Sequence, residues 1–291
     1  MSTVTVAVAT EARIARRETL LQLVKSKTFI AGVLIVGFWV VCALFGSHLA
    51  PHDPQDQSFD PLLSPRSGHL FGTDTLGRDV FSRVLVGAGD ILEVAPLAML
   101  LGIAGGTVVG LVTGYFRGVV DDVISRIVDA WLALPVIVIA VTVLVAVGSS
   151  KAALVVVIGV LFTPLVARTV RAAVLAERQL EYVQAARLRG ERAPHVMFVE
   201  ILPNIMGPII VEATVRLGYA IFAVAGLTFL GFGVQPPSPD WALQISDNYN
   251  NLNATANQGY YWTVLFPGAA VASLVVGVNL IADGIQHALE R

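Results

Sequence analysis

The segment EYVQAARLRGERAPHVMFVEILPN, residues 181–204, separates two long apolar stretches of the chain. It is rich in charge, whereas 55% of all residues are hydrophobic and only 14% are charged. The pattern predicts a short helix that ends at Gly190, because glycine readily takes the left-handed conformation found at helix C-termini. Pro194 is suited to begin a second helix, since the first helical turn does not need its N–H group. Pro203 would then interrupt the chain before the next apolar run.

This helical pair is expected to project from the rest of the protein. It would present Tyr182, Ala185 and Ala186 among charged residues, a surface suited to docking against another protein. The residues alone leave one alternative open, a solvated amphipathic loop that lies on a membrane surface.

The remainder of the chain is apolar enough to lie in a membrane. Its 291 residues have a mean hydropathy of +0.74, far above that of a soluble globular chain. A helix of about 20 apolar residues crosses a hydrocarbon core of about 30 Å, and no run shows the period-2 alternation of a membrane β-barrel. We expect an all-α polytopic membrane protein with six transmembrane helices, at 28–50, 91–116, 127–147, 152–175, 206–232 and 262–284.

These helices divide the chain into segments on the two sides of the membrane. Pro and Asn are dense between the fifth and sixth helices, which favours an irregular ordered loop over a further helix. No convincing cleavage site follows the first helix, so we expect it to remain as an anchor. The expected segments are an N-terminal segment (1–27), the first helix (28–50), an extracytoplasmic loop (51–90) and a five-helix core (91–291) that includes a cytoplasmic loop (177–205) and an extracytoplasmic loop (233–261).

The distribution of Lys and Arg predicts the orientation, since basic residues accumulate in cytoplasmic connections. One set of connections holds fourteen of them: those in 1–27, Arg117 and Arg126, those in 168–192, and Arg291. The opposite connections hold only four. Both termini and the segment 181–204 are therefore expected to be cytoplasmic.

Motifs for catalysis are missing from the sequence. There is no phosphate-binding G-x-x-x-x-G-K-[ST], no H-E-x-x-H and no G-x-S-x-G. The five histidines are scattered over separate segments, a poor pattern for a metal cluster, and the one cysteine lies in the first apolar run. We expect no catalytic residue, metal site or cofactor in this chain. Uphill transport would take its energy from an ion gradient or from another subunit.

Glycines recur every four residues in the second predicted helix, at Gly102, Gly106, Gly110 and Gly114. This spacing places them on one face, where a neighbouring helix can approach closely. Ordinary intramembrane packing is the simpler interpretation, and a helix that slides or rocks during transport is the alternative.

Two opposite charges lie one turn apart in the fifth predicted helix, at Glu212 and Arg216. Because charge in hydrocarbon is costly, they should pair and face the bundle interior or a wet cavity. They form either a structural pair or a contact in the translocation path. By the same argument, Asp129 is expected to pair with Arg126.

The segment 181–204 also resembles a known loop. The types and spacing of Ala185, Ala186, Gly190, Leu202 and Pro203 are similar to those of the cytoplasmic coupling loop, the "EAA" loop, of binding-protein-dependent ABC importer permeases. Three further stretches look like signatures of the C-type subunit of dipeptide and oligopeptide permeases: APHDP (50–54), GTDTLGRDVFSR (72–83) and LTFLGFGVQPPSPDW (227–241).

This resemblance implies a type I ABC importer permease fold in the bacterial cytoplasmic membrane, with a di- or oligopeptide as cargo. The subunit would pair with a homologous permease, and an extracytoplasmic binding protein would deliver the substrate. ATP and Mg would be held by two ATPase subunits that contact the loop, where Glu181 and Tyr182 add to the five matching residues.

Two other functions stay open. Related permeases carry nickel, glutathione or other small solutes, so the cargo is not settled by the resemblance. A secondary transporter driven by an ion gradient, with Glu212, Arg216 and Asp129 as its charged residues, is the alternative of another class.

Four positions depart from the pattern of the family. Gln184 replaces the first Glu of the loop, and Glu200 stands where this branch often has His. These two leave the docking shape intact. Val224 stands where the family has an acidic residue and Asp90 where it has an Arg, and these two positions bear on the substrate rather than on the fold.

Overall fold

A computed structural model of the chain describes residues 23, 25–253 and 260–289, so most of the expected N-terminal segment 1–27 lies outside the described residues. The described part is helical, and apart from two isolated β-bridges it contains no strand, which confirms the all-α prediction. Its α-helices are α2 (Lys27–Leu49), α3 (Val80–Phe116), α4 (Val119–Leu132), α5 (Val136–Val147), α6 (Lys151–Glu177), α7 (Glu181–Leu188), α8 (Ala193–His195), α9 (Leu202–Asn204), α10 (Met206–Phe229), α11 (Trp241–Asn248) and α12 (Trp262–Leu289).

Five of the described helices are long and apolar enough to cross a membrane: α2, α3, α6, α10 and α12. A sixth candidate span consists of α4 and α5, which are bent by 87° relative to each other. The prediction of six spans therefore holds only if this bent pair counts as one span.

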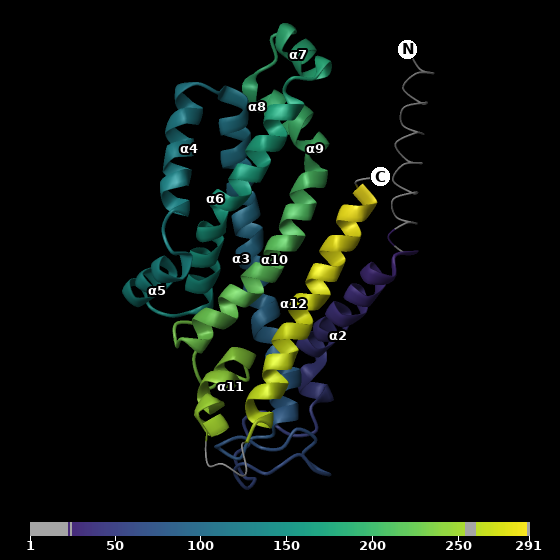
Figure 1. Cartoon of the computed structure of the whole chain (residues 1–291), viewed down its shortest axis with the longest axis vertical. Coiled ribbons are helices and arrows are strands. Elements are labelled where there is room, and N and C mark those ends of the chain that lie inside the picture. Colours follow the sequence, from purple (N-terminus) through teal and green to yellow (C-terminus); the bar gives the residue numbers. More distant parts are fainter. Residues whose placement is uncertain (1–22, 24, 254–259, 290–291) are drawn as a thin grey trace.

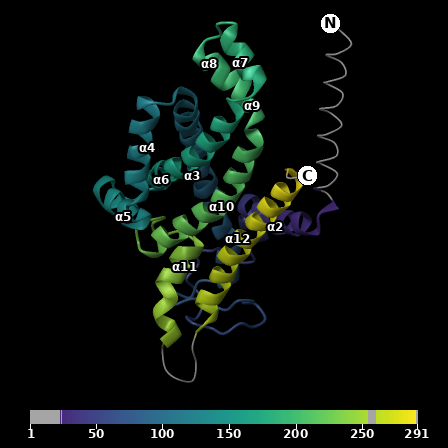
Figure 2. The same ribbon diagram turned by 45° about the horizontal axis from the view of Figure 1, so that its top comes forward.

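The long helices run between two polar ends of the molecule (Figures 1 and 2). One end carries α7, and we call it the α7 end; the start of α2 and the end of α12 point toward it but do not reach as far. The other carries the irregular segment 50–79 and α11, and we call it the α11 end. The described ends of the chain thus lie on the same side of the bundle as α7.

The prediction of one continuous helix over 127–147 is wrong. The chain forms α4 from Val119, then turns at Pro135 before α5. Proline lacks an N–H group, and it disfavours helical geometry in the residue before it, here Leu134. The apolar composition of this stretch concealed the break.

The helix α3 begins eleven residues before the predicted start at 91, and it is 37 residues long. Asp79 starts it, because the Asp79 side chain accepts hydrogen bonds from the backbone N–H of Ser82 (2.8 Å) and from its hydroxyl (2.7 Å). At 1.5 Å per residue the helix is about 55 Å long, well beyond the hydrocarbon thickness. Its first turns therefore extend into the α11 end.

The expectation of an irregular loop over 233–261 is also wrong. This stretch contains α11 and a 3₁₀ helix at Tyr249–Asn253. The Asp240 carboxylate caps α11 by accepting from the N–H groups of Ala242 (2.9 Å) and Leu243 (3.0 Å). A strong N-cap and the buried Trp241 outweigh the turn-forming composition around them.

The four spaced glycines of α3 lie against α6, and this is the most extensive helix contact of the described structure. Added Cβ atoms at Gly106, Gly110 and Gly114 would come within 2.4–2.7 Å of the Cβ atoms of valines on α6. Those partners are Val166, Val170 and Val174, which repeat every four residues like the glycines. The glycine strip therefore packs closely on α6, as its spacing predicts, and movement at this contact stays a prediction.

Replacing Gly106 by alanine tests this contact. Its new methyl group would lie 2.4 Å from the Val166 Cβ atom and 2.8 Å from the Thr163 carbonyl oxygen, so the two helices must separate. We expect a loss of about 1–3 kcal/mol in stability, typical of an overpacked core, measured as a lower unfolding temperature in detergent. Gly37→Ala in α2 is the control, because nothing lies within 4 Å of its added Cβ. Equal unfolding temperatures for the two variants would contradict the account.

Candidate coupling loop and charged clusters

The segment 181–204 folds as a helix, a turn and a second helical stretch, as its sequence predicts. Gly190 ends α7 with φ +78°, and an added Cβ there would meet no other atom. The need for glycine is therefore conformational rather than a matter of space. After the turn, α8 leads into a π-helical turn at Val196–Ile201 and then α9.

One face of α7 is buried and the other is exposed. Val183 and Ala186, three residues apart, are fully buried, whereas Ala185 is exposed and Tyr182 is half-buried. The expectation that Ala186 lies on the docking surface is thus wrong, because it lies on the same helix face as Val183. Leu188, at the end of α7, is 90% exposed and is the apolar side chain available at the tip.

Tyr182 joins three elements at the base of the loop. Its hydroxyl donates to the Glu177 carboxylate at the end of α6 (2.6 Å) and accepts from the Asn204 side chain of α9 (3.1 Å). Burial and the Glu177 carboxylate raise the pKa of Tyr182, so the hydroxyl remains protonated and can donate. Leu202 is half-buried and Pro203 is exposed beside this junction.

Two arginines connect the loop region to the end of α3. Arg178 donates to the carbonyl oxygens of Gly114 (3.1 Å) and Tyr115 (3.0 Å), which belong to the last turn of α3. The guanidinium group of Arg187, on α7, lies 4.4 Å from the centre of the Tyr115 ring. A displacement of α7 would therefore act on both α3 and α6.

The α11 end brings all three of the matching sequence stretches outside the loop together, which their separation in the chain did not predict. Arg83 is fully buried, and it donates to the carbonyl oxygens of Pro54 (3.0 Å) and Ser238 (2.9 Å). Nearby, the Arg78 Nε donates to Asp74 (2.6 Å). These bonds join the segment 50–79, the start of α3 and the loop before α11.

Asp90 forms part of a charged cluster at this end. Lys151, at the start of α6, lies 2.7 Å from Asp90 and 2.5 Å from Glu93. The Ser238 hydroxyl donates to the same Asp90 carboxylate. A cavity borders Asp90, Lys151 and Ser238.

The intramembrane charges pair, but not all with the predicted partners. Arg216 donates to Glu212 at 2.6 Å, and both side chains are largely shielded, which confirms the expected pair in α10. Asp129 pairs with Arg168 of α6 at 2.5 Å, so its predicted pairing with Arg126 is wrong. The reason is the fold: α4 packs against α6 and directs its acidic residues across the interface. Whether Glu212 and Arg216 contact a solute stays a prediction.

The geometry defines a polytopic helical membrane protein with a helical loop projecting from one end. The model of the family "Binding-protein-dependent transport system inner membrane component" matches residues 106–291, and the model "N-terminal TM domain of oligopeptide transport permease C" matches residues 16–65. The chain belongs to this family of importer permeases and is a multi-pass protein of the bacterial inner membrane.

Individual relatives agree with this assignment over most of their length. The dipeptide transport system permease protein DppC of Alkalihalophilus pseudofirmus is 37% identical, over 94% of this chain and 89% of the relative. DppC of Escherichia coli K12 is also 37% identical, over 91% and 89%. The glutathione transport system permease protein GsiD of Pectobacterium atrosepticum is 33% identical, over 94% and 90%.

The buried Asp240 predicts a specific pH dependence of stability. Burial, and then the charge of Asp90, raise its pKa to about 6, against the opposing effect of the Leu243 N–H. Since the folded state favours the protonated form, this carboxyl stabilises the fold at low pH. That contribution, on the order of 3 kcal/mol, is lost as the pH rises from about 4 to about 6.

Asp240→Asn removes the titration and keeps an oxygen that can cap α11. Its stability relative to the unmodified chain should therefore increase between pH 4.5 and pH 7, measured by thermal unfolding in detergent at each pH. A difference between the two proteins that does not change with pH would contradict this assignment.

Proposed function

We propose that this chain is one of two permease subunits of an ATP-driven importer for di- or oligopeptides. It forms half of the translocation pathway and pairs with a homologous permease. The supporting observation is that the family and its relatives, two of them named dipeptide permeases, extend over both the N-terminal helix and the core. An extracytoplasmic binding protein delivers the substrate to the α11 end.

In this proposal the α7 end faces the cytoplasm, together with both termini. The excess of Lys and Arg in the connections at this end supports that orientation. The segment 50–79 and α11 then face outward, where the binding protein docks.

The segment 181–204 is the surface on which a cytoplasmic ATPase docks. Leu188 provides an exposed apolar anchor, Ala185 a small exposed surface and Gly190 the turn. Because Tyr182 and Arg178 tie this region to α6, α9 and α3, closure of the ATPases on ATP binding moves these helices together. Such a movement opens the pathway outward, and hydrolysis resets it. ATP and Mg reside in the partner subunits, and this chain transports without an ATPase site of its own.

The cargo class follows from what the relatives are named for. The relative named for glutathione is almost as similar as those named for dipeptides. Glutathione is itself a small peptide, so a short peptide is the cargo class common to these relatives. The charged cluster at Asp90 and Lys151 offers both signs of charge to the two ends of such a molecule.

The docking surface is tested by placing a charge at its tip. Leu188→Asp should prevent ATPase subunits from co-purifying with the tagged chain, because an apolar anchor is replaced by a hydrated carboxylate. Leu70→Asp is the matched control: Leu70 is an exposed leucine (60%) in the segment at the opposite end. Mass spectrometry should find the ATPases with the control and at least about tenfold less with Leu188→Asp. Retention of the ATPases by both variants would contradict the proposed surface.

The alternative of a gradient-driven carrier is tested at the charged pair in α10. We expect the double variant Glu212→Gln/Arg216→Gln to retain peptide uptake that follows ATPase activity. The two substitutions remove both charges together, so neither charge is left unpaired and the helix stays intact. Uptake by whole cells is measured with ATP depletion and with an ionophore. Uptake that depends on the ion gradient, persists without ATP and disappears in the double variant would establish the carrier instead.

A further inference from the structure

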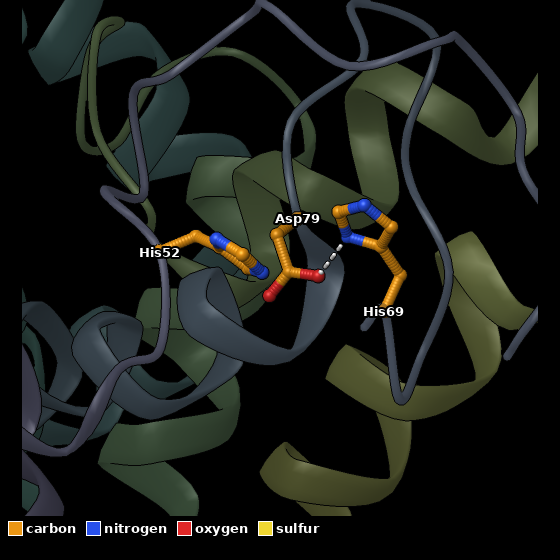
Figure 3. Close-up of side chains that lie close together, drawn as sticks. All are labelled: His52, His69 and Asp79. Carbon is orange, nitrogen blue, oxygen red and sulfur yellow. Dashed lines mark hydrogen bonds and ion pairs between the residues drawn. The ribbon is translucent and has the colours of Figure 1, made fainter. Parts of the chain in front are cut away.

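Two histidines and an aspartate meet at the α11 end, although they are separated in the sequence (Figure 3). His52 follows the end of α2, His69 lies beside a tight turn that pairs it with Arg66, and Asp79 caps α3. The spacing of the histidines gave no sign of this cluster, because three separate parts of one irregular segment bring it together. None of the three residues belongs to the coupling loop or to the pair in α10.

The donor atoms of the cluster lie close enough to share one ion. One ligand atom from each of His52, His69 and Asp79 lies within 4.8 Å of the other two. The His69 Nδ1 and the Asp79 Oδ1 are 2.9 Å apart, and the two imidazole rings are 5.1 Å apart between centres. Figure 3 shows the carboxylate of Asp79 between the two rings.

The surroundings hold these side chains in place. The second Asp79 oxygen accepts from both the backbone N–H and the hydroxyl of Ser82, and the Ser82 hydroxyl in turn accepts from the backbone N–H of His52 (3.2 Å). The His52 Nε2 lies 3.0 Å from the Gly68 carbonyl oxygen. Asp79 is fully buried and His69 is 8% exposed. Such outer contacts orient metal ligands and raise affinity.

We propose that His52, His69 and Asp79 form a site for a divalent transition-metal ion of the zinc class. Two imidazole nitrogens and one carboxylate oxygen suit Zn²⁺, whereas Ca²⁺ and Mg²⁺ require shells of oxygen ligands. The metal takes the place of the proton that His69 shares with Asp79, because metal and proton compete for the same nitrogen lone pair. Water completes the coordination.

The bound ion would fasten the segment 50–79 to the start of α3. Its three ligands come from the beginning, the middle and the end of that segment, and without metal these points are joined by hydrogen bonds and ring contacts. The consequence is local stabilisation of the surface at the α11 end, independent of which solute the protein carries. A purely hydrogen-bonded cluster, by contrast, gains nothing from zinc.

The experiment measures Zn²⁺ binding to the full chain, purified in detergent with a tag that contains no histidine and stripped by a chelator. The ligand atoms of a second group, Glu191, His195 and Glu200, also lie within 4.8 Å of one another. All proteins in the experiment therefore carry His195→Gln, which removes zinc binding by that group. Zinc affinity is measured by competition with a chromophoric chelator, and Ca²⁺ serves as the comparison ion. Protection of residues 51–79 from protease with and without Zn²⁺ is the second measurement.

The chain with His52 and His69 intact should bind one Zn²⁺ in preference to Ca²⁺ and become protected from cleavage. His52→Gln and His69→Gln should each weaken zinc binding at least about tenfold and abolish the protection. Tenfold is the lower end of the loss in metal affinity seen when groups around a metal site are altered. His48→Gln, an exposed histidine at the end of α2, should change neither. His52 is only half-buried, so its variant remains informative if His69→Gln does not fold. Equal zinc binding by His52→Gln and His48→Gln, or no zinc binding by the intact site, would overturn the proposal.

Discussion

The close contact between α3 and α6 is the constraint on which the rest of the structure depends. Three glycines of α3 and three valines of α6 fit together at the same four-residue spacing. In hydrocarbon there is no hydrophobic force between apolar helices, so close packing of this kind holds them together. Because the segment 181–204 follows α6 directly, and α3 extends from one end of the molecule to the other, this pair connects the α7 end with the α11 end.

Polar interactions are concentrated where the α3–α6 pair leaves the hydrocarbon. At the α7 end, Arg178 and Tyr182 attach the loop to α3 and α9. At the α11 end, buried Arg83 attaches the start of α3 to two separate loops. A buried guanidinium is tolerated only when carbonyl or carboxylate groups surround it. The long helices thus carry little polar chemistry themselves and connect two polar ends.

Sequence reasoning succeeded where periodicity or a single residue determines the structure. The apolar runs predicted most of the helices, the spacing of the glycines predicted the face that packs on α6, and Gly190 predicted the turn of the loop. It failed where one local residue outweighed the composition of the stretch around it. Pro135 breaks an apolar run into α4 and α5, and the Asp240 cap forms α11 inside a stretch rich in turn residues.

Contacts between distant segments could not be read from one sequence. Arg168, rather than the nearby Arg126, pairs with Asp129 because α4 lies against α6. His52 and His69 meet only because the segment between α2 and α3 folds back on itself. Such pairings depend on the path of the chain in space, which the spacing of residues along the sequence does not predict.

The central claim is that the tip of α7 transmits the action of an ATPase to this permease, and cysteine cross-linking tests it most directly. The chain has one cysteine, the buried Cys42, which is first replaced by serine. A cysteine is then placed at Leu188, and a short cross-linker is added to native membranes. The account predicts a cross-linked product that contains an ATPase with a phosphate-binding loop, with a yield that changes when ATP is bound. Cross-linking at this position to no ATPase, while the importer remains active, would contradict it.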